Sequence, residues 1–112
     1  MSLGPGSIVT VHLINPTEKF WALLERLEPV GIVFRGISLD FFEPWVNELA
    51  RGEESTLGCS TQFVPLFRVE RVFLDTPVGE VESYRQRFER RTGLAAAAAL
   101  GGEDSASEPV SN

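Results

Sequence analysis

The segment NPTEKFWALLERLEPVGIVFRG, residues 15–36, decides which fold this chain can adopt. Its first half can be read as a helix. Asn15 can cap it, Pro16 suits the first helical position, and the apolar residues between Phe20 and Leu27 recur at helical spacing. Read as a strand, the same stretch places apolar side chains on both faces at one end. These local signals favour a helix.

The residues that follow favour a β-hairpin. Glu28-Pro29-Val30-Gly31 has proline at the second and glycine at the fourth position of a turn, which is the preferred arrangement. A short β-rich run follows it. A helix would have to continue into Pro29, and the residue before a proline resists helical geometry. A hairpin with arms 21–27 and 32–38 fits the turn, so helix and hairpin both remain open for residues 20–27.

The other elements follow from standard signals. Residues 8–14 are β-branched and apolar, and they predict a strand. Residues 39–51 predict the clearest helix, with Asp40 and Glu43 at capping-box spacing and Gly52 as its stop. Residues 59–75 read as a strand, a tight break and a second strand. Pro65 there indicates an edge position or a bulge, where its missing N–H is harmless.

The end of the chain divides into a helix and a tail. Residues 82–92 predict a short helix with Ser83 as its cap, Tyr84 and Phe88 on its inner face, and Gly93 as its terminator. Residues 94–112 are of low complexity and are expected to be a disordered tail. Residues 1–7 are rich in glycine and proline and are expected to be a flexible N-terminus. A single globular domain is therefore expected over residues 8–93.

Two segments resemble a known family. FVPLFRVERVFLD, residues 63–75, resembles the strand, 3-10 turn and closing strand of small Sm-like and SH3-like barrels. VTVHLINPTEKFWALLERLEPVGIVFRGI similarly looks like their first three strands. The resemblance spans about residues 8–75 and favours the hairpin. It implies a mainly β fold with α elements: a small five-stranded barrel with an inserted helix at about 40–51 and a C-terminal helix at about 82–92.

The chain departs from the RNA-binding members of that family. They carry a characteristic Asn and an Arg-Gly or Lys-Gly pair in the loops that line a ring. Here Arg35-Gly36 precedes the long helix, and residues 63–75 contain no glycine. The RNA site of the family is therefore not carried over to this chain.

Charge argues against nucleic acid as the preferred partner. The formal net charge is −6, and residues 1–92 hold thirteen acidic and all ten basic residues, so this part alone is net acidic. Binding to a phosphate backbone requires clustered Lys and Arg. The arginines between Arg85 and Arg91 do cluster, but Glu82 and Glu89 lie among them, as on a solvated helix face. We expect no tight, salt-sensitive binding to RNA.

Catalytic and metal chemistry find no support in the sequence. Cys59 and His12 are the only residues of their kinds, so no disulfide can form within the chain and no Cys/His zinc site can be assembled. No base or oxyanion loop accompanies Cys59, Ser60 or Thr61. We expect no enzyme activity and no cofactor. Neither a secretory signal nor a membrane span is recognisable, so the expected location is the cytoplasm.

The expected function is a non-catalytic interaction module that forms a homo-oligomer or acts as an adaptor, with an Sm-like RNA-binding protein as the alternative. Eight Phe and two Trp are many for a domain of this size, so apolar surface should be shared between subunits. The candidate interface residues are Phe41, Phe42, Trp45, Leu49, Phe63 and Phe67. The candidate contacts to a partner or an anion are Arg35, Arg68 and Arg71. Arg68 and Arg71 are also expected to pair with Glu70.

Overall fold

The segment 15–36 folds as a β-hairpin and not as a helix. In the computed structural model, which describes residues 3–101, strand β2 (Glu18–Glu28) pairs antiparallel with strand β3 (Gly31–Ser38). β2 resembles a helix in sequence because both of its faces are buried. Phe20 and Leu24 enter one core, and Trp21 enters another. The hairpin prediction is confirmed.

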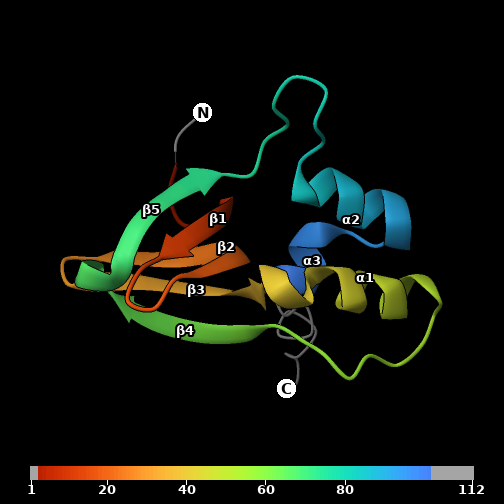
Figure 1. Ribbon diagram of the computed structural model, residues 1–112, viewed down its shortest axis with the longest axis horizontal. Coiled ribbons are helices and arrows are strands. Elements are labelled where there is room, and N and C mark those ends of the chain that lie inside the picture. The colour runs from red at the N-terminus through yellow and green to blue at the C-terminus, as the bar shows by residue number, and fades with distance from the viewer. Residues whose placement is uncertain (1–2, 102–112) are drawn as a thin grey trace, which may run out of the picture.

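Five strands form one antiparallel sheet (Figure 1). The remaining strands are β1 (Ile8–Leu13), β4 (Ser60–Pro65) and β5 (Val69–Leu74), and the order is β4-β3-β2-β1-β5. β4 and β5 follow each other in the chain through a 3-10 turn, η2 (Leu66–Arg68), yet lie at opposite edges. The predicted strand, break and strand are confirmed. The sheet is open, so its closure into a barrel is not confirmed.

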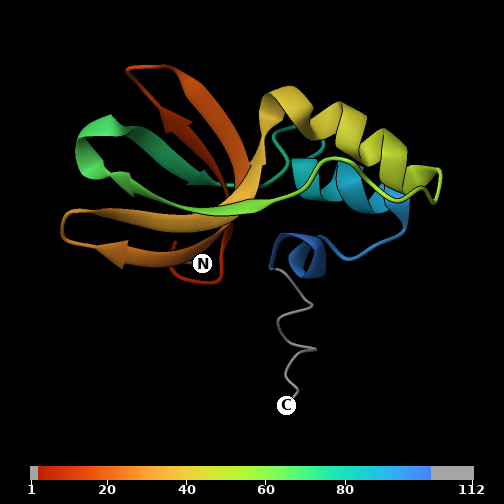
Figure 2. The ribbon, with the colours of Figure 1, turned by 90° about the horizontal axis from the view of Figure 1, so that it is seen from below.

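The two faces of the sheet carry separate cores. Figure 2 shows the three helices together beside the sheet. One core consists of strand residues alone: Val9, Val11, Leu13, Phe20, Ala22, Leu24, Ile32, Phe34 and Val64. The other lies between the sheet and the helices: Trp21, Ile37, Phe42, Trp45, Val46, Phe88, Ala96 and Leu100. We call the second one the helix-side core. Trp21 is fully buried at its centre, with ring centroids 5.4 Å from both Phe42 and Phe88.

The helix predicted over 39–51 starts later than the sequence indicated. A 3-10 turn, η1 (Leu39–Phe41), comes first, and α1 (Phe42–Ala50) follows. The predicted capping box between Asp40 and Glu43 does not form. Instead Asp40 lies inside η1 and donates its backbone N–H to the Ser38 hydroxyl at 3.2 Å. A cap on η1 therefore replaces a side-chain cap on α1.

Helix α2 (Tyr84–Thr92) agrees with its predicted signals. The Ser83 hydroxyl accepts from the N–H of Gln86, and the Gln86 side chain accepts from the N–H of Ser83, which completes a capping box. Gly93 ends the helix in the left-handed region at φ 75°, where a glycine is favoured.

Both ends of the globular unit extend beyond the predicted limits. A third helix, α3 (Ala96–Gly101), buries Ala96 and Leu100 in the helix-side core, so the unit does not end at residue 93. At the N-terminus, expected to be flexible, Gly6 N–H donates to the Leu24 carbonyl at 2.7 Å, and Leu24 N–H donates to the Ser7 carbonyl at 2.9 Å. The predicted disorder of residues 102–112 lies outside the described residues.

Truncating Leu100 should test how firmly α3 is docked. Leu100→Ala is expected to lower the free energy of unfolding by about 2–5 kcal/mol, because it removes buried methyl groups from a packed core. Ala98→Ser on the exposed side of the same helix is the control and should change stability little. Urea denaturation followed by circular dichroism measures both. Equal stabilities would contradict the docking of α3.

No helix within residues 3–101 is long and apolar enough to cross a membrane.

Candidate functional site

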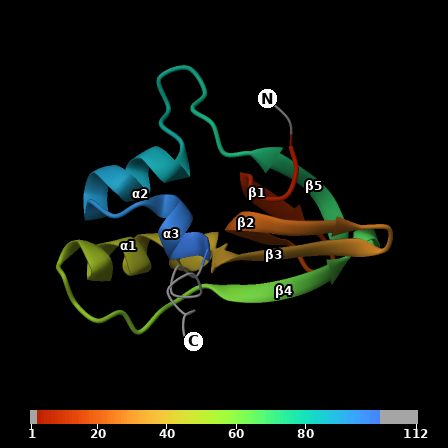
Figure 3. The same cartoon turned by 180° about the vertical axis from the view of Figure 1, so that it is seen from behind.

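The turn between β2 and β3 lies at the end of the sheet away from the helices (Figure 3). Large apolar side chains are exposed at this end. They come from the turn of the β2–β3 hairpin and from β4 with η2, and two of them are 79% and 67% exposed. The Leu66 N–H donates to the Val30 carbonyl at 2.9 Å, which joins the two segments. We define the end patch as Leu27, Val30, Phe63, Leu66 and Phe67.

Gly31 allows Phe63 to lie across the hairpin. A Cβ atom built on Gly31 would fall 2.5 Å from Cζ of Phe63 and 2.5 Å from the carbonyl oxygen of Val64. Only a residue without a side chain permits this approach, and a strand glycine often marks such a contact. One side of the Phe63 ring therefore rests on backbone, and the side chain is still 50% exposed.

The end patch is unusual for a chain of this size. An aromatic side chain can bury about 150–250 Å² when it is fully covered. Phe67 is 79% exposed, so most of its apolar surface is in contact with water. Large exposed apolar side chains gathered at one end of a sheet form a candidate binding surface on a soluble protein.

The candidate interface residues divide between core and surface. Phe63 and Phe67 belong to the end patch. Phe42 and Trp45 are 1% and 5% exposed in the helix-side core, and Leu49 packs against that core, so the stripe on α1 is not an uncovered surface. The remaining residue of the stripe, Phe41, is exposed.

Phe41 lies apart from the end patch. With Ser38, Asp40 and Ser60 it lines an open groove of about 400 Å³ near the start of β4. The groove also contains Glu18, so its charged lining is acidic. This groove offers no continuous apolar surface.

Sequence reasoning missed three members of the end patch: Leu27, Val30 and Leu66. A signal was available for one of them. Val30 sits in a tight turn beside Pro29, and a turn this short leaves its side chain in solvent. No signal in the sequence brings Leu66 to the hairpin, because that contact depends on the pairing of β3 with β4.

Arg68 holds the sheet together at η2. Its Nε donates to the Ile14 carbonyl at 2.9 Å, and one terminal nitrogen donates to the Pro16 carbonyl at 2.7 Å and pairs with Glu18 at 3.3 Å. The predicted pairing of Arg68 with Glu70 is therefore wrong. The partners lie about fifty positions earlier in the chain, and they leave the guanidinium occupied by the β1–β2 loop.

Arg35 occupies a different part of the sheet. It lies in the middle of β3, opposite Leu23 of β2 and Thr61 of β4. The side chain is half-buried, and its Nε is buried with no hydrogen-bond partner among residues 3–101. β2 and β1 separate it from Arg71 on β5. The structure does not bring the three candidate arginines together.

Arg71 belongs to a row of basic groups that crosses three strands. In register it is opposite His12 of β1, and His12 is opposite Lys19 of β2. Burial lowers the pKa of His12, and the nearby positive charges of Lys19 and Arg71 lower it further, while Glu70 opposes them. These effects favour the neutral form of His12, and its ring packs edge-on against Phe73 at 5.0 Å.

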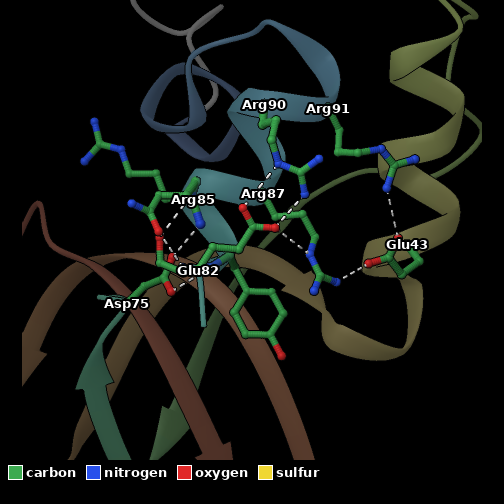
Figure 4. A network of polar contacts seen from close by, with 10 residues as sticks. Glu43, Asp75, Glu82, Arg85, Arg87, Arg90 and Arg91 are labelled. Carbon is green, nitrogen blue, oxygen red and sulfur yellow. Dashed lines mark hydrogen bonds and ion pairs between the residues drawn. The ribbon is translucent and has the colours of Figure 1, made fainter. Parts of the chain in front are cut away.

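The arginines of α2 are satisfied by carboxylates (Figure 4). Arg90 pairs with Glu82 at 2.6 Å, Arg87 with Glu43 at 2.5 Å and Arg85 with Glu89 at 3.5 Å. Arg91 also reaches Glu43, at 3.4 Å. These contacts join α2 to α1 and to the preceding loop. The cluster therefore sets four arginines against three glutamates, which leaves little unpaired positive charge for a phosphate backbone.

Asp75 links the sheet to the start of α2. Its carboxylate accepts from Trp21 Nε1 at 2.9 Å, from the Tyr84 N–H at 3.0 Å and from the Arg85 N–H at 2.8 Å. A carboxylate placed against the N-terminus of a helix also interacts favourably with the helix dipole. Asp75 thus has a structural role, which fixes α2 over Trp21.

Cys59 is unsuited to nucleophilic chemistry. Burial raises the pKa of its thiol to about 11, and the charge of Arg35 opposes this only in part. The thiolate is the reactive form, so the group is unreactive at neutral pH. Within the described residues, no group of three or more His, Cys, Asp or Glu side chains is placed to hold a metal ion.

No family model matches this chain, and the searches of curated proteins and of solved structures also found no match.

Proposed function

We propose that this protein is a non-catalytic interaction module that self-associates, and that the end patch is the contact surface. The observation that carries the proposal is the exposure of Phe63 and Phe67 beside the hairpin turn. Burying this apolar surface in a complex stabilises the complex by roughly 25 cal/mol per Å². Interfaces are also enriched in aromatic residues at their centres.

We also propose that the fold is related to the small Sm-like and SH3-like barrels. The support is the strand order β4-β3-β2-β1-β5 together with the helical turn η2 between β4 and β5. The insertion of α1 before β4 departs from that family, as does the place of Arg35-Gly36 in the middle of β3. This relationship concerns architecture and carries no ligand with it.

The RNA-binding alternative has less support. It requires Arg35, Arg68 and Arg71 to gather on one exposed surface. Arg68 is engaged by Glu18 and two carbonyl groups, and two strands, β2 and β1, lie between Arg35 and Arg71. The net charge of −6 opposes an electrostatic contribution from the rest of the chain.

Removing Phe67 should weaken self-association without harming the fold. At high micromolar concentration, light scattering should give an oligomer for the unmodified chain and a shift toward monomer for Phe67→Ser. The Phe67 side chain is 79% exposed, so the melting temperature of the monomer should hardly change. Phe41→Ser is the control, since Phe41 is also exposed but lies outside the end patch. A monomeric mass for the unmodified chain at every concentration would refute the proposal.

A further inference from the structure

The outer edge of β4 is open along residues 60–64, and Pro65 lies at its end. β4 and β5 are the two edge strands, and neither has a second strand partner within residues 3–101. Natural proteins protect such edges with charges, prolines or bulges, because an open edge can pair with another chain. β5 carries Glu70 and Arg71 and has a bulge opposite His12 and Leu13. β4, with the sequence STQFVP, has no charge and an unbroken register.

The hydrogen bond from Leu66 to Val30 shows which backbone groups of β4 face outward. In an antiparallel ladder, hydrogen-bonded pairs alternate with non-hydrogen-bonded pairs. Leu66 is hydrogen-bonded to Val30, so the positions of β4 that are hydrogen-bonded to β3 continue at Val64 and Gln62.

The backbone groups of the alternate positions of β4 face outward. The N–H and C=O groups of Thr61 and Phe63 therefore point away from β3. Pro65 also faces outward and offers only its carbonyl.

We propose that two copies of this chain pair antiparallel through β4, about a two-fold axis that passes through Gln62. This inference rests on the proposed self-association and specifies its geometry. In this register Thr61 faces the partner's Phe63, and Phe63 faces the partner's Thr61. Each of these pairs exchanges two N–H···O=C bonds, and the sheet continues from one copy into the next.

The outward groups of β4 favour a second copy as the occupant, because they are complementary to themselves. Two free donor and acceptor positions, at Thr61 and Phe63, match their own pattern after a two-fold rotation. The strand carries no charge, so identical strands do not repel each other. The two copies of Phe63 become diagonal neighbours, within reach of aromatic contact.

Pro65 selects the register. If the axis passed through Phe63, Thr61 would face the partner's Pro65, which has no N–H to donate. That register leaves the carbonyl of each Thr61 unpaired, whereas the register centred on Gln62 pairs both backbone groups of Thr61 and of Phe63. A contact from β4 to β5 of another copy would meet the bulge and the charges of β5. It would also leave a free edge on each copy, which leads to rings or open chains instead of a closed dimer.

Cysteine cross-linking can test the pairing in the full chain. With Cys59→Ser as the background, Gln62→Cys places two thiols opposite each other in a non-hydrogen-bonded pair, where the Cβ atoms are close enough for a disulfide. Under mild oxidation most of this variant should become covalent dimer and nothing larger. Ser60→Cys is the matched control on the same strand and face. Its two thiols would lie four positions out of register, so it should stay uncross-linked.

A second variant tests the backbone bonds. Thr61→Pro removes an N–H that faces outward, so it should leave the pairing with β3 intact and convert the dimer to a monomer in light scattering. Covalent dimers from Ser60→Cys, or an unmodified dimer that survives Thr61→Pro, would overturn the proposed pairing. An oligomer that Gln62→Cys fails to cross-link would overturn the pairing and leave the proposed self-association standing. A monomeric unmodified chain would refute both.

Discussion

Trp21→Ala should lower the free energy of unfolding by about 3–5 kcal/mol, a large share of what a small domain possesses. Trp21 is fully buried, and apolar side chains of the helices pack against it in the helix-side core. Its ring lies 6.3 Å from that of Trp45, in addition to its contacts with Phe42 and Phe88. Removing it leaves a cavity between the sheet and both α1 and α2, and urea denaturation should show the loss directly.

Trp21→Phe separates packing from hydrogen bonding at the same site. Phenylalanine keeps most of the ring and loses the donor to Asp75, so the expected loss is about 1 kcal/mol. Asp75 retains its two backbone donors from α2, which limits the cost. If Trp21→Phe proved as destabilising as Trp21→Ala, the Trp21–Asp75 bond and not the packing would dominate this core.

The local sequence pattern predicted only part of the hairpin. The turn at residues 28–31 was recognisable because proline and glycine have direct conformational effects. The arm before it was ambiguous, because a strand buried on both faces loses the alternation that distinguishes strands from helices. Leu23 and Leu24 face different cores, and nothing near them in the sequence states that a second core exists.

The apolar stripe on α1 was predicted to be an interface because the second core could not be foreseen from the sequence. The apolar stripe on α1 was visible in the sequence, but what covers it was not. Part of the cover is α3, which begins in a run of alanines that reads equally well as a tail. A weakly apolar segment acquires a buried role only when the rest of the fold presents a surface to it.

The partners of the arginines could not be predicted from the sequence. Arg68 lies among charged neighbours in the sequence, which favoured a local ion pair with Glu70. Its actual partners belong to the loop between β1 and β2, brought near by the pairing of β1 with β5. Long-range partners of this kind depend on topology, and a single sequence does not specify them. The place of Leu66 beside the hairpin escaped sequence reasoning for the same reason, because it depends on the pairing of β3 with β4.

Trp45→Glu should abolish the folded state and not release a folded monomer. Trp45 is 5% exposed, and its ring lies 5.1 Å from that of Phe88. The substitution removes the ring and places a carboxylate among the apolar side chains of the helix-side core. Far-ultraviolet circular dichroism and the dispersion of a proton NMR spectrum should both report an unfolded chain.

Phe41→Glu, four positions earlier, is the control that separates the two possible roles of the stripe. Phe41 is 51% exposed, so a charge there stays in water and the variant should fold with nearly unchanged stability. The two variants add the same charge at neighbouring turns and differ only in burial. If Trp45→Glu remained folded and merely lost self-association, Trp45 would have to be accessible in the free chain. The contact surface would then move from the end patch to α1.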